Sequence, residues 1–564
     1  MALRLRRPLT PRERRLLLRV GPVAVVAVIA FVVGVRAGGS GRRADSNAAE
    51  RYAAAWARND VGAMYDGLSA SSRAGTSRAA FATALGADRS TATVVSARAG
   101  RPGTHHGGAV DVPVVVRTRA FGTLRLIWAV PVRDGRVHDT GAAHFPGLRP
   151  GEHLTRMMAM PRRATILARD GTPLARGTTR TPAPRAADVA EQVVGQLGTP
   201  PKAEREARRA EGYPTTALVG TTGLERALED KLAGRPGGVL REGGRVIARS
   251  RPRRALPVRT SIDVGIERAA INGLAGRLGG VAAVNPRTGE ILALAGVAYS
   301  ALQPPGSTFK IITTAAALKA HMVKLTDTFP VQTGAVLEGR TLQNASGESC
   351  GGTLVNSFAQ SCNSVFAPLG AKVGGRRLVA AAEAFGFNHP VGIPGAATST
   401  IPSAATIGDD LAVGSSAIGQ GRVQASALQM SLVAATVATG GRRPVPTLLA
   451  RSRPRLVRAI PRGVARTLRT LMLAVVREGT GTAAQISGVE VAGKTGTAEL
   501  QSTQPSPGQP LGASTVDTDA WFVACAPAAR PRIATGVLLV QAGGGGAVAA
   551  PAARQVLEVG LKRR

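Results

Sequence analysis

An uncharged apolar run near the N-terminus most strongly limits how this chain can fold. Val20–Val35 is sixteen residues long without a charge, and Arg36 ends it. The preceding segment, Met1–Arg19, holds seven arginines and one acidic residue. A membrane-spanning helix needs about 20 apolar residues, and arginines at both ends can extend a shorter run by reaching to the interfaces. We therefore predict a cytoplasmic basic tail over residues 1–19 and a transmembrane anchor over residues 20–37.

The arginine-rich flank also predicts the orientation of the chain. Basic segments beside a membrane helix stay in the cytoplasm, so the rest of the chain is expected on the other side of the cytoplasmic membrane. The predicted localisation is the cell membrane, single-pass, with an extracytoplasmic catalytic domain. A cleaved signal peptide is the alternative interpretation of the same segment.

Arginine dominates the charge of the chain. Lysine and arginine together number 72 against 35 acidic residues, a net charge of +37, and only eight of the 72 are lysines. Such a charge favours contact with polyanions, whereas a GC-rich genome explains the same excess without a partner. The predicted export and the lack of aromatic platforms argue against nucleic acid as a partner. Because lysines are so few, the position of each one is informative.

Changes in composition and periodicity predict several domains. A helical pattern at Ala48–Leu68 and strand-like runs that turn at Gly122 predict a small α+β domain over residues 45–148. Residues 149–257 are rich in arginine and proline and weakly patterned, with one clear helix at Gly223–Leu232. We expect an irregular linker there, and a disordered stretch around residues 178–209 is the alternative.

The C-terminal half has stronger periodicity. From residue 258 onward, strand patterns at both ends enclose apolar helical stretches, which predicts a mixed sheet packed against a helical subdomain. One apolar helix, Gly306–Ala320, follows a Pro-Pro-Gly break. Strands are predicted at Ala520–Ala526 and Ile533–Val540, and a closing helix at Ala552–Leu561.

A serine and a lysine open the helix that follows the Pro-Pro-Gly break. Ser307 lies in its first turn, where free N–H groups and the helix dipole favour a developing oxyanion. Lys310 is three residues further on, so its side chain lies on the same face. In a partly desolvated site its amine can act as a base toward the hydroxyl. Alone, the pattern also fits an N-cap serine with a solvated lysine.

A second motif, Ser361-Cys362-Asn363, follows 54 residues after the first serine. Its hydroxyl and amide can both face a cleft from a loop. Ser361 is a candidate proton relay between Lys310 and the leaving group, and Asn363 a candidate hydrogen-bond donor to a substrate amide. By itself the motif is more typical of a structural turn.

A third motif, Lys494-Thr495-Gly496-Thr497, follows the strand-like run Val489–Ala492. Alternation along a strand turns Lys494 and Gly496 away from the two threonines, so a twist is expected to help present the edge. The glycine lets a substrate backbone approach closely, and an edge strand can pair with an extended peptide. The lysine and threonine side chains suit a terminal carboxylate. An exposed edge strand guarded by lysine is the alternative.

The three motifs in this order resemble those of class B penicillin-binding proteins, a set also found in class A β-lactamases. The resemblance covers about residues 260–564. It is supported by Val284–Ala293, Ile418–Gly421 with Gln429-Met430, and Ala520–Phe522 with Ala526-Pro527.

The upstream region resembles the N-terminal module of methicillin-resistance-type transpeptidases. The resemblance rests on His144–Leu148, Gly151-Glu152 and Arg162–Gly171, although Ala168 replaces the usual aspartate. Gly223–Glu225 and Leu232–Gly234 are similar to the pedestal region of the family. The implied fold class is multi-domain α+β. It consists of the membrane helix, a cone-shaped domain like nuclear transport factor 2 (45–148), a linker/pedestal domain (149–257) and a serine β-lactamase/transpeptidase-like α/β domain (258–564).

The resemblance implies a D,D-transpeptidase that cross-links peptidoglycan. Ser307 would attack the penultimate D-alanine carbonyl of a stem peptide, and an amine from a neighbouring stem would take the acyl group. The implied catalytic residues are Ser307, Lys310, Ser361 and Asn363. The implied substrate-binding residues are Lys494, Thr495, Gly496 and Thr497, and the N–H groups of Ser307 and Thr497 would form the oxyanion hole.

The family also implies partners and alternatives. Stem peptides, covalently bound β-lactams and the cytoplasmic membrane are the expected partners, with no cofactor and no metal. A membrane glycan polymerase is a further expected partner, because no glycosyltransferase-type acidic motif is seen upstream. A D,D-carboxypeptidase or β-lactamase-type hydrolase is the first alternative, disfavoured by the multi-domain stalk. A catalytically inactive β-lactam sensor is the second, disfavoured by three intact motifs.

Two of the three cysteines are close in sequence. Cys350 and Cys362 are twelve residues apart, and an exported chain meets an oxidising compartment. We predict a disulfide between them that would hold Ser361 and Asn363 against the cleft, with two separate buried thiols as the alternative. Cys525, on a predicted core strand, is expected to be unpaired.

Overall fold

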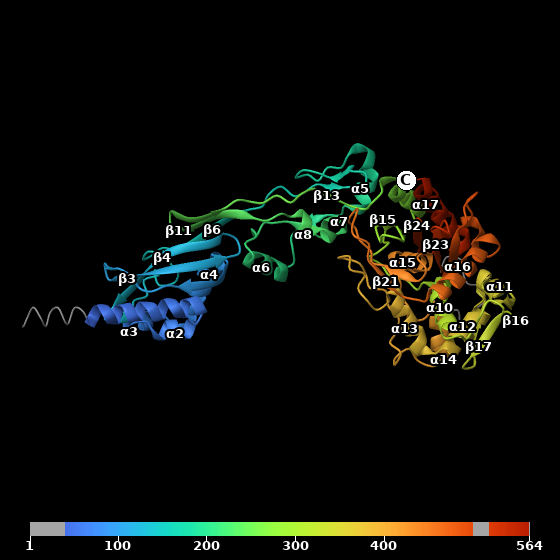
Figure 1. Ribbon diagram of the computed structural model, residues 1–564, viewed down its shortest axis with the longest axis horizontal. Helices are drawn as coiled ribbons and strands as arrows, with labels where there is room; N and C mark the ends of the chain where they lie inside the picture. Colours follow the sequence, from blue (N-terminus) through green and yellow to red (C-terminus); the bar gives the residue numbers. More distant parts are fainter. Residues whose placement is uncertain (1–39, 500–517, 563–564) are drawn as a thin grey trace, which may run out of the picture. The chain divides into compact units, whose positions relative to one another are not determined.

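The computed structural model describes residues 40–499 and 518–562, which fold into two compact units (Figure 1). The predicted basic tail (1–19) and membrane anchor (20–37) lie outside these residues. Within the described ranges, no helix combines the length and apolarity needed to cross a membrane. Each unit is built from helices packed on antiparallel sheet, as an α+β class requires.

The first unit consists of residues 40–161 together with 200–217 and 234–254. Its helices are residues 40–58, α2 (Val61–Asp66), α3 (Ala70–Gly75), α4 (Arg78–Thr91) and α6 (Lys202–Ala210). Its strands are β1 (Val94–Ala99), β2 (His105–His106), β3 (Ala109–Thr118), β4 (Gly122–Arg133), β5 (Arg136–Val137), β6 (Leu154–Ala159), β11 (Gly237–Glu242) and β12 (Arg245–Ser250). They form one sheet around β1-β3-β4-β5 and a second of order β12-β11-β6.

The core of the first unit is an aromatic cluster between its first helix and β4. Trp56 meets Trp128 and Phe145 edge-on, with ring centroids 5.4 and 5.6 Å apart. The hairpin predicted at Gly122 is confirmed, because Thr118 pairs with Gly122 across the turn. Helices α3 and α4 were not predicted from the sequence; serine side chains cap the N-terminus of each.

Residues 149–257, predicted as one irregular domain, contribute to both units. The chain crosses between the two units five times within this segment, and the predicted domain boundaries at 148 and 257 remain predictions. The pieces in the second unit are β7 (Ile166–Leu167), β8 (Pro173–Ala175), η1 (Pro184–Ala186), α5 (Ala187–Val193), β9 (Leu197–Gly198), β10 (Val219–Gly220), α7 (Gly223–Ala227) and α8 (Glu229–Leu232). The side chain of Glu225 is fully buried and joins these segments by ion pairs to Arg163 and Arg180, with N–O distances of 2.5 and 2.6 Å.

The second unit is organised by a five-stranded antiparallel sheet of order β15-β14-β24-β23-β22. These strands are β14 (Gly279–Val284), β15 (Ile291–Gly296), β22 (Ala492–Glu499), β23 (Thr518–Ala526) and β24 (Ile533–Leu539). Helices α9 (Val264–Leu274) and α17 (Ala550–Lys562) cover one face, and α15 (Ala427–Ala438) covers the other. Because both faces are covered, the strands are apolar at nearly every position rather than alternating.

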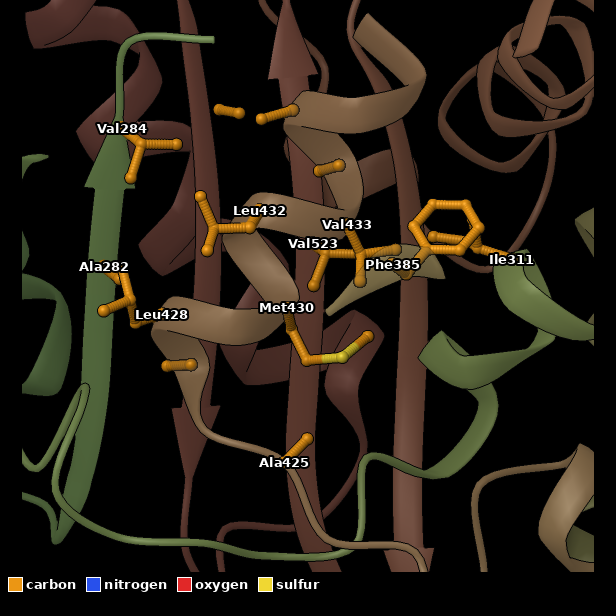
Figure 2. Packing of buried hydrophobic residues seen from close by; sticks show 14 of the residues in the cluster. Ala282, Val284, Ile311, Phe385, Ala425, Leu428, Met430, Leu432, Val433 and Val523 are labelled. Atoms are coloured by element: carbon orange, nitrogen blue, oxygen red, sulfur yellow. The ribbon is translucent and has the colours of Figure 1, made fainter. Parts of the chain in front are cut away.

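Figure 2 shows the α15 side of this sheet, where Leu428 and Leu432 lie against β14 and Val523 of β23. Successive side chains of β14 point to opposite faces of the sheet. Ala282 and Val284 face α15, whereas Val281 and Ala283 face α9 and α17. Every residue of α15 is buried, so this helix is the centre of the unit.

The remaining elements of the second unit form a helical subdomain and short connecting strands. They are β13 (Val258–Arg259), η2 (Gly306–Phe309), α10 (Lys310–Lys319), β16 (Thr328–Gln332), β17 (Gly334–Leu337), β18 (Arg340–Gln343), η3 (Ala345–Gly347), β19 (Cys350–Thr353), α11 (Leu354–Ala359), α12 (Asn363–Val373), α13 (Gly375–Phe385), α14 (Asp410–Ala417), β20 (Arg442–Pro444), β21 (Leu456–Arg458), α16 (Arg462–Arg477), η4 (Thr482–Ala484) and η6 (Gly545–Ala549). Helix α10 packs on α12, α13 and α16, so its N-terminus is held from several sides.

Buried Glu267 of α9 generates a stability prediction. One carboxyl oxygen accepts the Leu294 N–H at 2.6 Å, the other has no partner in the described part of the chain, and burial raises the pKa of Glu267 to about 8. A raised pKa favours the neutral acid in the fold, so stability is full below pH 4.5 and is lost as the pH rises to about 8. Unfolding titrations should show Glu267→Gln more stable than wild type at pH 8, by on the order of 3 kcal/mol, with the gain vanishing near pH 4.

Exposed Glu191 provides the control, since Glu191→Gln should change stability little at either pH. An equal stability difference for Glu267→Gln at both pH values would contradict the assignment.

Candidate active site

Ser307 and Lys310 lie where the prediction placed them, at the start of a buried helix. Residues of η2 run directly into α10, and almost every side chain of α10 is buried. Gly306 has φ +52°, and a Cβ there would meet the Thr497 carbonyl oxygen at 2.6 Å. Only glycine fits this position. The turn that carries Ser307 therefore lies directly against the backbone of the third motif.

Lys310 is fully buried and points at the second motif. Its Nζ donates to the Ser361 carbonyl oxygen (2.6 Å), to Asn363 Oδ1 (2.7 Å) and, more weakly, to Ser361 Oγ (3.3 Å). The Ser307 hydroxyl has no hydrogen-bond partner among the described residues. Lys310 Nζ therefore hydrogen-bonds to the second motif and not to Ser307 in this structure.

Ser361 is held in a strained conformation between two lysines. Its φ of +64° is left-handed, which is unfavourable for a residue with a Cβ and typical of functional sites. Its Oγ accepts from Lys494 at 2.8 Å as well as from Lys310. Asn363 opens α12, and its amide nitrogen donates to the Gln343 carbonyl. The structure thus brings the first two motifs and the lysine of the third together around one hydroxyl.

The third motif lies on β22, the edge strand of the sheet. The predicted strand position is wrong: β22 begins at Ala492, where the predicted strand ends, and pairs regularly with β23 through Glu499. No twist is needed, because alternation turns Lys494 toward Ser361 while Thr495 faces the loop after α16. A Cβ on Gly496 would meet the Pro305 carbonyl at 2.8 Å, so this glycine allows β22 to lie against the nucleophile turn.

The two lysine side chains share an environment that disfavours their charge. Burial lowers the pKa of Lys310 well below the ordinary lysine value, and the positive charge of Lys494 lowers it further. Burial lowers the pKa of Lys494 to about 7. Each Nζ lies 5.6 Å from an aromatic ring centroid, Phe366 for Lys310 and Phe358 for Lys494, and this contact offsets part of the cost of burying the charge. Lys310, one helical turn from Ser307, is the candidate base.

The structure has the disulfide between Cys350 and Cys362, with Cα atoms 5.7 Å apart. It ties β19 to the residue between Ser361 and Asn363. Cys525 is a free, buried thiol on β23, as predicted, and burial raises its pKa to about 12. In the described ranges, no group of three or more histidine, cysteine or acidic side chains is arranged to hold a metal ion.

Two site residues were not assigned a role from the sequence. Gly419, with φ +75°, accepts the Gly306 N–H at 3.0 Å, and a Cβ on it would meet the Gly306 carbonyl at 2.0 Å. Thr480 bonds to Thr495 from the loop after α16. The glycines on both sides of Thr480 are the sequence signal that marks this loop as tightly packed.

Two known protein families match the sequence of this chain, and both agree with the geometry described above. The family described as the penicillin binding protein transpeptidase domain matches residues 279–558, and the penicillin-binding protein dimerisation domain matches residues 184–253. The chain belongs to the class B penicillin-binding proteins.

Relatives and solved structures agree with this assignment. The peptidoglycan D,D-transpeptidase PbpA of Mycolicibacterium smegmatis is 38% identical over 289 residues, covering 47% of this chain and 56% of the relative. This penicillin-binding protein thus spans about half the length of that relative. A D,D-transpeptidase domain from Eggerthella lenta is 28% identical, with TM-score 0.58, covering 72% of this chain and 99% of that one. Penicillin-binding protein A of M. tuberculosis, an imipenem acyl-enzyme complex, is 27% identical, with TM-score 0.55 and coverages of 71% and 99%.

The disulfide predicts the result of peptide mapping and the stability of cysteine variants. Non-reducing peptide mapping should recover Cys350 and Cys362 as one linked pair, with Cys525 alkylated only after unfolding. Removing the bridge by Cys350→Ala, Cys362→Ala or both should lower unfolding free energy by about 3 kcal/mol in the chain-entropy picture. The two single variants and the double variant should lose similar amounts, because each removes the same bond. Free, alkylatable Cys350 and Cys362 in the native oxidised protein would refute the pairing.

Proposed function

We propose that this chain is a peptidoglycan D,D-transpeptidase that works through an acyl-enzyme on Ser307. The observation that carries the proposal is the buried Lys310, whose pKa is lowered by burial and which lies one helical turn from Ser307. A neutral amine there can accept the Ser307 proton as the hydroxyl attacks the carbonyl of a D-alanyl-D-alanine stem peptide. The products of this first step are the Ser307 ester and free D-alanine.

The other motif residues have distinct parts in the proposed reaction. Ser361 Oγ contacts both lysines, so it can pass a proton toward the leaving amine. The N–H groups of Ser307 and Thr497 are proposed to stabilise the oxyanion, which is supported by the contact between Gly306 and the Thr497 backbone. Lys494, charged when a carboxylate is bound, and the hydroxyls of Thr495 and Thr497 would hold the substrate carboxylate.

The strand edge explains how an extended stem peptide would be recognised. Among the residues that the structure describes, β22 pairs with a strand on one side only, and its outer edge is proposed to pair with a peptide backbone. Asn363 would hydrogen-bond an amide of the same substrate. An amine from a second stem would then attack the Ser307 ester and complete the cross-link, without a cofactor or a metal.

Binding partners and location follow from the same proposal. The imipenem acyl-enzyme of the M. tuberculosis structure supports covalent β-lactam binding at Ser307 here. The arginine-flanked run at residues 20–37 supports a single-pass anchor in the cytoplasmic membrane, with the second unit outside the cell. A membrane glycan polymerase would supply the strands to be cross-linked.

The decisive test is covalent labelling of the intact chain by a fluorescent penicillin. Intact mass should increase by one penicillin, and peptide mapping should place it on Ser307. Ser307→Ala should lose labelling entirely while its melting temperature stays near that of wild type. Labelling of the alanine variant at another serine would refute the assignment. Incubation with a stem-peptide donor and an amine acceptor should then yield cross-linked dimer, whereas hydrolysed donor alone would identify a carboxypeptidase.

The shifted lysine pKa values predict the pH profile of acylation. The rate should rise as Lys310 loses its proton, at a pH well below the ordinary lysine range, and fall at higher pH as Lys494 loses the charge that attracts the carboxylate. Lys310→Arg keeps the positive charge but cannot be deprotonated, so it should not acylate at any pH. Stopped-flow acylation from pH 5 to 10 measures this. If Lys310→Arg retains the wild-type profile, Lys310 is not the base.

A further inference from the structure

Thr480 joins the two halves of the active site from outside the three motifs. It lies in the loop Glu478–Gly481, which follows α16, a helix packed on both α11 and β22. Its N–H and Oγ1 both donate to the Ala359 carbonyl, at 3.1 and 3.3 Å. The same Oγ1 lies 2.5 Å from the Thr495 hydroxyl oxygen. One side chain therefore bonds the end of α11, two residues before Ser361, to the strand that carries Lys494.

Close packing fixes the position of this loop. A Cβ on Gly479 would meet the Ala359 carbonyl oxygen at 2.4 Å, and a Cβ on Gly546 would meet the Thr480 carbonyl oxygen at 2.3 Å. Backbone thus approaches backbone on both sides of Thr480, and the loop has no room to shift without moving α11 or η6. This packing positions the backbone of Thr480 so that its hydroxyl can reach Thr495.

The contacts close a ring around the site. Thr495 Oγ1 is 3.5 Å from Lys494 Nζ, Lys494 Nζ donates to Ser361 Oγ, and Ser361 follows Ala359 in the chain. A carbonyl only accepts, so when Thr480 donates to Ala359 the Thr495 hydroxyl must donate to Thr480. The Thr495 oxygen then turns a lone pair toward the ammonium of Lys494. Thr480 thereby sets the hydrogen-bond direction of a threonine proposed to bind the substrate carboxylate.

The strained backbone of Ser361 makes such support necessary. A non-glycine residue at φ +64° persists only where the surroundings over-determine it. Thr480 anchors Ala359 on one side of Ser361, and the disulfide of Cys362 anchors the other side. The two anchors approach from different elements, so the position of Ser361 relative to Lys494 depends on both.

We propose that Thr480 is a positioning residue for acylation, which holds Ser361 and Lys494 at their working separation and orients the Thr495 hydroxyl. The proposal rests on the proposed function, since it concerns the acylation of Ser307. It assigns a role to a residue outside the three motifs, because the side chain acts through Thr495 and Ala359.

The test compares acylation by a fluorescent penicillin between the wild-type full chain and variants at Thr480, Thr495 and a control position. Thr480→Val keeps the shape and the N–H bond but removes the hydroxyl, so the acylation rate should fall about fivefold to tenfold. Its falling pH limb should move to lower pH, because the Lys494 ammonium loses an oriented acceptor. Thr480→Ser should restore the rate and the pH profile. Exposed Thr482, two residues away, supplies the matched control Thr482→Val, which should behave as wild type.

The double variant Thr480→Val/Thr495→Val decides whether the two hydroxyls act together. If Thr480 acts through Thr495, the second substitution costs much less in the double variant than alone. Full additivity, or a Thr480→Val variant with wild-type rate and pH profile, overturns the proposal. If Thr480→Val melts early, Thr480→Ala against Thr480→Ser makes the same comparison. A wild-type chain that does not acylate at Ser307 would instead refute the proposed function.

Discussion

Two lysine ammonium groups buried around one serine hydroxyl are the constraint on which the second unit depends. Lys310 and Lys494 have no solvent exposure, and within residues 40–499 and 518–562 no acidic side chain forms an ion pair with either one. Burying a charge without a counter-ion is costly, so the neutral amine becomes accessible near neutral pH. The hydroxyl and carbonyl oxygens of Ser361 compensate part of that cost, and they must be held within hydrogen-bond distance for the arrangement to persist.

Two parts of the second unit hold the lysines at these distances from Ser361. One lysine comes from a helix in the core of the helical subdomain, and the other from the edge of the five-stranded sheet. Glycines at 306, 419, 496 and 545 let these elements approach until backbone meets backbone, at positions where a Cβ would come within 3 Å of its neighbours. With only 3% aromatic residues, the chain gains its close packing from alanine and glycine rather than from large side chains.

Two acidic side chains away from the active site also carry the cost of burying a charge. Glu225 is fully buried but paired to two arginines, so it can fasten the segments around α7 as a charged group. Glu267 is equally buried and has only one backbone donor, which favours its neutral form. The difference between these two acids is set by the arginines that the fold brings to Glu225, and neither environment is visible in the local sequence.

The sequence by itself determined the family, the three motifs and most strands of the central sheet, and it predicted the disulfide while leaving two separate thiols as the alternative. These follow from short-range patterns: apolar runs, prolines and glycines that break helices, and cysteines twelve residues apart. Local propensity failed in residues 149–257, where the hairpin of β11 and β12 is completed by β6, a strand about 80 residues earlier in the chain. It also placed the last edge strand a few residues early, because glycine and lysine do not look like a strand until β23 pairs with them. Only the tertiary structure decided that Ser361 lies between two lysines and that Thr480 joins α11 to β22. These contacts link residues 15 to 133 positions apart, and only the packing of the helical subdomain against the sheet brings them within hydrogen-bond distance.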